Sequence, residues 1–198
     1  MKKQILFFIM GCIALLACGG NDKTTPAKPV AITDTTAPKP QRFFPVTGFL
    51  RGDLAAIKQK GVNPVKITVV GQKIDSAWLT LEQLPAELSE FLQPVIDSTN
   101  LIDFYKETSF QDQTINTFTF TYEPRGPLPD SLTLRRWDVY VDADNQTVKK
   151  VYLVKQITTD GKPKTLQLTW EAGKRCKMLT LNPETSTVEK EVTILWDF

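Results

Sequence analysis

The stretch Thr117-Phe118-Thr119-Phe120-Thr121-Tyr122 decides which fold this chain can adopt. Aromatic residues occupy every second position in it, and threonines occupy the positions between them. Successive side chains of a β-strand point to opposite faces, so this period of two predicts a strand with one apolar face and one threonine face. The apolar face must pack against other elements, because a sheet buries such a face in a core.

The same period of two continues to the end of the chain. The next apolar alternation runs from Trp137 to Val141, and turn signals follow at 142–146, at Asp160-Gly161 and at Gly173. These turns separate further apolar segments at 148–157, 166–170, 174–181 and 188–196. Strands with a turn signal about every ten residues predict an antiparallel meander.

Two helical patterns precede this strand-rich part. Apolar residues recur at helical spacing over 46–57, where Pro45 suits the first turn and Gly61 suits the end. A second stripe of this kind lies at 81–95, and the residues 65–70 indicate a short strand between the two. Helices first and sequential hairpins afterwards predict the α+β class, with N-terminal helices packed on a curved, mostly antiparallel β-meander sheet.

Capping residues mark the approach to the second predicted helix. Asp75 and Ser76 suit the N-terminus of a helix, and Thr80 with Gln83 three residues later resembles a capping box. Pro85 falls near the first turn of a helix that is capped at Thr80, where proline is tolerated. The chain is therefore expected to enter a helix after the short strand.

The N-terminal segment has the form of a bacterial export signal. Two lysines follow the initiator methionine, and the apolar run 5–17 is shorter than the roughly 20 residues that span a membrane. Leu15-Leu16-Ala17-Cys18 closes the run and resembles the lipobox of bacterial lipoproteins. This resemblance implies cleavage between Ala17 and Cys18 and attachment of lipid to Cys18. The alternative is an ordinary secretory signal with an incidental cysteine.

The composition after Cys18 indicates a tether followed by one folded domain. We expect a lipoprotein signal peptide at 1–17, a lipidated, Pro/Thr-rich disordered tether at 18–42 and a single domain at 43–198. Surface-exported lipoproteins of the Bacteroidota resemble one another in carrying an acidic cluster after the cysteine, and this chain has none. We therefore expect a lipid-anchored protein of the cell envelope, on the outer membrane and facing the periplasm.

Charge and missing residue types exclude several classes of function. The precursor has 24 Lys+Arg against 22 Asp+Glu, and loss of Lys2 and Lys3 leaves a neutral chain without the basic patch that nucleic acid requires. The chain has no histidine, which excludes Ser-His-Asp and Cys-His catalytic sites and removes the commonest metal ligand. No phosphate-binding glycine loop or dinucleotide motif occurs. We therefore expect no enzyme, no cofactor and no metal.

Two further features have ordinary structural explanations. Asp142-Ala143-Asp144-Asn145-Gln146 resembles the start of a calcium loop, but Thr147 and Leu153 stand where that loop requires glycine and glutamate. A hairpin turn rich in Asp and Asn explains the segment better. Cys176 is the one free thiol expected in the mature protein, and its strand pattern predicts a buried, inert residue.

Arg135-Arg136-Trp137 is the densest mixture of charge and aromatic ring on one predicted strand. These three residues are the candidate binding site, for an anionic ligand. The alternative is a solvated strand face with a cross-strand salt bridge. A hydrolase that uses carboxylates alone is a further alternative, although no spacing singles out any two of them. The carboxylates concerned are Asp112, Glu123, Asp130 and Asp138.

Two resemblances concern the body of the protein. The segment 137–142, a polar turn and the segment 148–151 resemble a PepSY-type hairpin, a module of secreted and membrane proteins that is thought to bind or inhibit. The whole chain resembles the uncharacterised lipoproteins that are common in Bacteroidota, which supports the anchor. We therefore expect a membrane-anchored, non-enzymatic binding or structural domain, with the membrane (through lipid on Cys18) and an unknown envelope protein as its partners. The alternative is a carrier or sensor of a lipid-like ligand held in the concave face of the sheet.

Overall fold

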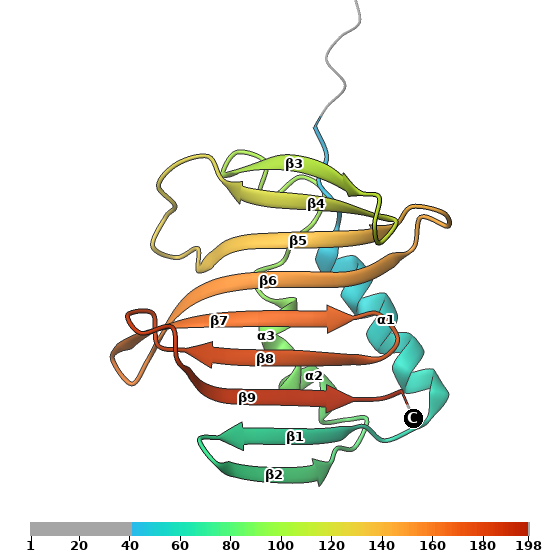
Figure 1. Ribbon diagram of the computed structural model, residues 1–198, viewed down its shortest axis with the longest axis vertical. Coiled ribbons are helices and arrows are strands. Elements are labelled where there is room, and N and C mark those ends of the chain that lie inside the picture. Colours follow the sequence, from blue (N-terminus) through green and yellow to red (C-terminus); the bar gives the residue numbers. More distant parts are fainter. Residues whose placement is uncertain (1–40, 198) are drawn as a thin grey trace, which may run out of the picture. The chain divides into compact units, whose positions relative to one another are not determined.

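The computed structural model describes residues 41–197, and every strand in this range belongs to one antiparallel sheet (Figure 1). The strands are β1 (Val65–Val70), β2 (Lys73–Trp78), β3 (Tyr105–Asp112), β4 (Thr117–Pro124), β5 (Leu134–Asp142), β6 (Val148–Thr159), β7 (Lys162–Glu171), β8 (Arg175–Leu181) and β9 (Val188–Leu195). Their spatial order is β2-β1-β9-β8-β7-β6-β5-β4-β3. From β3 to β9 each strand pairs with the next, and the β1–β2 hairpin joins the sheet at β9.

The predicted α+β class, with N-terminal helices packed on a curved β-meander sheet, is wrong. The described chain is mainly a nine-stranded antiparallel sheet with three small helices. These are α1 (Val46–Lys60), α2 (Leu84–Glu87) and α3 (Ser89–Leu92). The second predicted helix fails because Leu88, with φ −101° and ψ 8°, leaves the helical conformation and separates two single turns.

The predicted fold also missed the strand β2, because Asp75 and Ser76 were interpreted as residues that precede a helix. Asp75 and Ser76 pair with β1 in a hairpin that reverses direction at Gly71, where φ is 59°. This positive φ favours glycine, because it has no Cβ. Farther along, Gln83 does accept a hydrogen bond from the backbone N–H of Thr80 through its side chain, at 2.8 Å. That contact caps a turn rather than a long helix.

Residue pairing across the sheet separates two faces. Tyr122, Trp137, Leu153 and Leu168 lie in one row across β4 to β7, and all four are buried. We call the face that carries this row the core face. The strand predicted for 117–122 is confirmed as part of β4, and its aromatic residues stand opposite apolar residues of β5. Tyr122 stacks on Trp137 with 4.6 Å between ring centres. The opposite side, which we call the outer face, carries Thr119 and its row neighbours.

The helix α1 is confirmed as predicted, and it contributes its apolar residues to the core. Leu50, Leu54 and Ile57 are buried, and Gly61 ends the helix in the left-handed conformation. Thr47 accepts a hydrogen bond from the backbone N–H of Ile96 at 2.8 Å, which holds the chain after α3 against the start of α1.

Residues 40–198 form one compact unit with its own core, which includes buried side chains from Phe43 to Trp196. A unit that contains its own hydrophobic core is expected to fold by itself. Within the described range, no helix is both long and apolar enough to cross a membrane. The predicted signal peptide, Ala17, Cys18 and most of the predicted tether lie outside the described residues.

Candidate functional site

The structure does not bring the three residues of the predicted anion site together. Trp137 is fully buried on the core face, whereas Arg135 and Arg136 bind side chains of the outer face. A register shift between Leu134 and Arg136 accompanies this arrangement. Arg135 donates to Gln156 Oε1 at 2.8 Å, so its Nε already has an acceptor.

Arg136 lies between two carboxylates. Its Nε is 3.1 Å from both oxygens of Asp138, and its Nη1 is 3.6 Å from Glu123 on the neighbouring strand β4. The hydrogen bond to Asp138 is the main cause that raises the pKa of Arg136. Asp138 is only 1% exposed, so this carboxylate is committed to the ion pair and closed to solvent. The geometry therefore makes Asp138 a structural group.

Tyrosines flank the buried carboxylate of Asp138 on the outer face. Burial raises the pKa of Tyr140 and of Tyr152, and the negative charge of Asp138 raises both further. Tyr140 also carries Lys150 above its ring, with 3.9 Å between Nζ and the ring centre. Such a contact between an ammonium and an aromatic face contributes about 0.5–1 kcal/mol at an exposed site.

A groove of about 670 Å³ opens on the outer face beside Tyr140. It is formed where the β3–β4, β5–β6 and β7–β8 connections lie at one end of the sheet. Its apolar wall includes Ile115, Val148 and Ala172, and its charged residues are Lys149, Lys150, Glu171 and Lys174. A volume of about 300–1,000 Å³ is usual for small-molecule sites, so the groove can hold a compact ligand.

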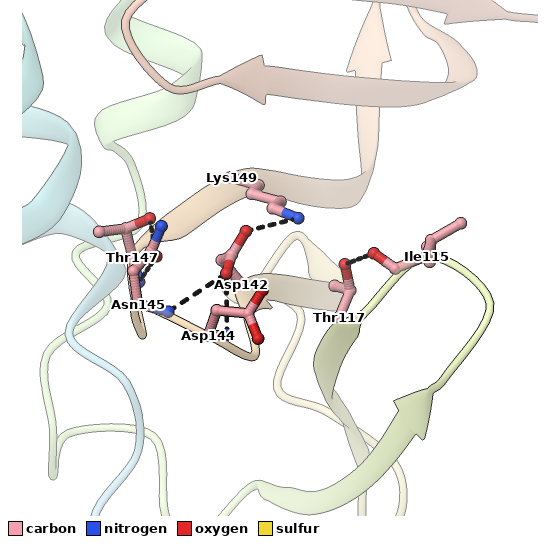
Figure 2. A network of polar contacts seen from close by, with 7 residues as sticks. All are labelled: Ile115, Thr117, Asp142, Asp144, Asn145, Thr147 and Lys149. Carbon is pink, nitrogen blue, oxygen red and sulfur yellow. Dashed lines mark hydrogen bonds and ion pairs between the residues drawn. The ribbon is translucent and has the colours of Figure 1, made fainter.

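The β5–β6 turn supplies one side of this groove and is a network of short polar contacts (Figure 2). Asp142 Oδ1 accepts from the backbone N–H of Asp144 at 2.9 Å and of Asn145 at 3.2 Å. Its other oxygen lies 2.7 Å from Lys149 Nζ. The bond from Lys149 is the largest cause that lowers the pKa of Asp142, and the two backbone bonds lower it further.

These contacts confirm the interpretation of 142–146 as a hairpin turn. Asp142 accepts hydrogen bonds from two backbone N–H groups of the turn and forms an ion pair with Lys149. An Asp side chain commonly stabilises a turn in this way. Within residues 41–197, no group of three or more acidic or cysteine side chains is placed to hold a metal ion. Thr117 and Thr147 also donate locally, to Ile115 O and to Asn145 Oδ1.

The charges in the groove are not balanced. Lys149 is paired with Asp142, and Glu171 accepts from Arg175 at 2.8 Å. In the described part of the chain, Lys150 has Tyr140 but no carboxylate partner, and the side chain of Lys174 makes no ion pair or hydrogen bond. Sequence patterns could not reveal this groove, because it is assembled from three separate turns.

A second exposed feature lies at the edge of the sheet. The edge strand β2 is exposed along its whole length, with Ile74 73% and Trp78 69% exposed. Both lie on the outer face, where Val69 stands opposite Ile74 and Val65 stands opposite Trp78. Leu195 on β9 follows Val65 in the same row. The period of two in Ile74-Asp75-Ser76-Ala77-Trp78 could have indicated this strand from the sequence.

The remaining predicted residues have local roles. Cys176 is buried, as predicted, and burial raises the pKa of its thiol well above the usual range. Asp112 accepts hydrogen bonds from Thr114 in the β3–β4 turn, which lower the pKa of Asp112. Glu123 pairs with Arg136.

Comparisons with protein-family models, with curated proteins and with solved structures found no match to this chain.

Proposed function

We propose that this protein is a membrane-anchored lipoprotein of the cell envelope with a non-enzymatic body that binds another envelope protein at the edge strand β2. The lipobox-like stretch 15–18 supports the anchor, with Cys18 as the lipidated residue. The observation that carries the binding proposal is the exposed apolar edge formed by Ile74 and Trp78.

An edge strand is suited to binding an extended protein segment. Alternate residues of such a strand direct backbone N–H and C=O groups away from the sheet, where another strand can pair with them. The partner adds backbone hydrogen bonds, and its side chains at alternate positions supply specificity. On β2 the residues whose backbone groups point away from the sheet are Ile74, Ser76 and Trp78. A partner segment that fits this edge therefore carries apolar side chains beside Ile74 and Trp78.

The opposite edge of the sheet is less suited to this role. On β3 the large exposed apolar residue is Phe110, which is 66% exposed. Its row neighbour on β4 is Thr119, whereas Trp78 continues inward to Val65 and Leu195. The row of apolar residues that ends at Trp78 therefore continues over three strands, whereas Thr119 interrupts the row that ends at Phe110. A broad apolar patch on a protein surface commonly marks an interaction site.

The other binding role expected for this chain is that of a carrier or sensor, which would hold a lipid-like ligand against the concave face of the sheet. The core face supports it less well, because large aromatic side chains pack under its centre. The hollows at its margin are lined in large part by charged side chains, among them Lys66, Lys164 and Lys190. Trp170 lies 5.3 Å from Phe91 and 5.1 Å from Trp196 between ring centres, and all three are buried. We therefore place the proposed binding role at the sheet edge.

Site-specific crosslinking tests the proposal. A photo-crosslinking amino acid at Ile74 of the full chain, expressed in cells, is expected to capture a discrete envelope protein. The same substitution at Phe110 is the matched control on the other edge and should capture little. Trp78→Lys should reduce binding of the captured protein at least tenfold, because a charge on an edge strand opposes strand addition. Equal capture from both positions, or no protein captured at Ile74, would contradict the proposal.

A further inference from the structure

We propose that the outer-face groove binds a small anionic molecule that has an apolar portion, such as the anion of a medium-chain fatty acid. This site is separate from the edge strand β2, since the groove is lined by residues of β4 to β7 and of their connections.

The charged side of the groove specifies an anion. Lys149 and Glu171 already have partners, Asp142 and Arg175. Lys150 and Lys174 add two ammonium groups to which no described carboxylate is paired. An ammonium group has three N–H donors, and a charged hydrogen bond to a carboxylate or phosphate is among the stronger ones in proteins.

The ring of Tyr140 holds Lys150 in place for this role. Its Nζ lies 3.9 Å from the centre of the ring, so the aromatic face restrains the ammonium from one side. A ring does not accept strongly from the N–H groups, which stay available to an oxygen anion. Lys150 also faces Glu171 across the β6–β7 register, but Glu171 is bound to Arg175.

The opposite wall specifies the apolar portion. Ile115 is 60% exposed at the β3–β4 turn, and Val148 and Ala172 line the same groove. A bare inorganic anion would leave this wall in water, whereas an alkyl chain would cover it. Each CH₂ group that is buried should raise the affinity roughly fourfold. A groove of about 670 Å³ has room for a medium-length chain together with its head group.

Amide chemical shifts of the labelled body, residues 40–198, test the proposal. Octanoate is expected to produce saturable shifts in the β5–β6 and β7–β8 turns, around Lys150 and Lys174. Inorganic phosphate, which is anionic without an alkyl chain, and octyl glucoside, which has the chain without charge, should each bind at least tenfold more weakly. Raising the salt concentration should weaken the binding of octanoate.

Paired lysine variants supply the control. The double variant Lys150→Gln with Lys174→Gln should lose roughly tenfold or more in octanoate affinity, because it removes both ammonium groups that donate charged hydrogen bonds to the carboxylate. Lys58→Gln with Lys106→Gln changes the net charge equally at exposed positions outside the groove and should bind as the parent does.

Three results would overturn the inference. The first is the absence of saturable shifts in the two turns with octanoate. The second is equal octanoate affinity in the double variant and its control, with unchanged amide spectra elsewhere showing that both are folded. The third is binding to phosphatidylglycerol vesicles without binding of octanoate, which would assign the lysines to a membrane surface instead.

Discussion

Asp53 on α1 accepts a hydrogen bond from the indole of Trp170 on β7, with 2.6 Å between Oδ2 and Nε1. The same oxygen accepts from the backbone N–H of Gly173 at 3.1 Å. Trp170 is fully buried, so its N–H depends on this acceptor. One carboxylate therefore ties α1 both to the centre of the sheet and to the β7–β8 turn.

Asp53→Ala is expected to lower the free energy of unfolding by about 2–3 kcal/mol, because it leaves a buried donor without its charged acceptor. Urea unfolding followed by tryptophan fluorescence measures the change. Asp130→Ala, in an exposed loop, is the matched control and should change stability by less than about 0.5 kcal/mol. A similarly small effect of Asp53→Ala would show that the bond does not hold α1 in place.

Lys155 leads to a second stability prediction. It is a cation on the core face, 2% exposed, and its Nζ donates to the backbone oxygen of Glu90 and to Glu90 Oε2, the latter at 2.8 Å. Glu90→Ala removes the carboxylate and leaves a buried ammonium, so it should cost about 1–3 kcal/mol. Lys155→Met should cost less, because a buried ion pair can often be replaced by an apolar side chain of similar volume.

Thermal and urea unfolding of the two variants decide between these expectations. Glu87→Ala, which removes a carboxylate paired with the partly exposed Lys66, is the control and should cost less than about 1 kcal/mol. If Lys155→Met destabilised the body more than Glu90→Ala, the ammonium itself would be the stabilising group, and the expected order would be wrong.

Local patterns predicted the parts of this fold that local physics determines. The alternation at 117–122 and the apolar stripe at 46–57 each mark one apolar face, and both segments became the predicted strand and helix. The pairing of β1 with β9 was not predictable in this way, because Val65 and Leu195 are distant in sequence. The burial of Lys155 was not predictable from the sequence either, since a lysine at a core-face position interrupts the apolar pattern of β6.

The candidate site was still harder to predict. Arg135, Arg136 and Trp137 are adjacent in sequence, but Trp137 points into the core while the two arginines bind outer-face side chains. Adjacent residues of a regular strand face opposite ways, as Arg136 and Trp137 do, and the register shift between Leu134 and Arg136 is an exception for Arg135. Closeness in sequence is therefore a weak guide to a shared site. The groove, by contrast, joins Ile115 to Lys174, which no local motif connects.

The turn at Asp142 gives a prediction about pH. Lys149 and two backbone N–H groups lower the pKa of Asp142 in the folded state, while the unfolded chain has the ordinary value of about 4. The stability that this group contributes is therefore present above the unfolded pKa and is lost as pH falls through the folded pKa. Asp142→Asn should lower the melting temperature at pH 7, and the difference from the parent should shrink toward about pH 2.

Melting temperatures of both proteins across this pH range provide the measurement. Asp144→Asn is the matched control on the same turn, because the Asp144 carboxylate makes no hydrogen bond or ion pair within residues 41–197. The melting temperature of Asp144→Asn should equal that of the parent at every pH. A difference between Asp142→Asn and the parent that stayed constant down to about pH 2 would mean that the charge of Asp142 is not the cause.

The lipid anchor makes the last prediction, which concerns two cysteines of the N-terminal segment. If Cys18 is lipidated, Cys18→Ala should abolish incorporation of labelled palmitate and move the protein out of the membrane fraction. Cys12→Ala is the matched control, because Cys12 lies within the apolar run that is expected to be removed with the signal peptide. That variant should be labelled and fractionate as the parent does. Palmitate labelling that persisted in Cys18→Ala would refute the lipobox assignment, and with it the membrane anchor on which the proposed function rests.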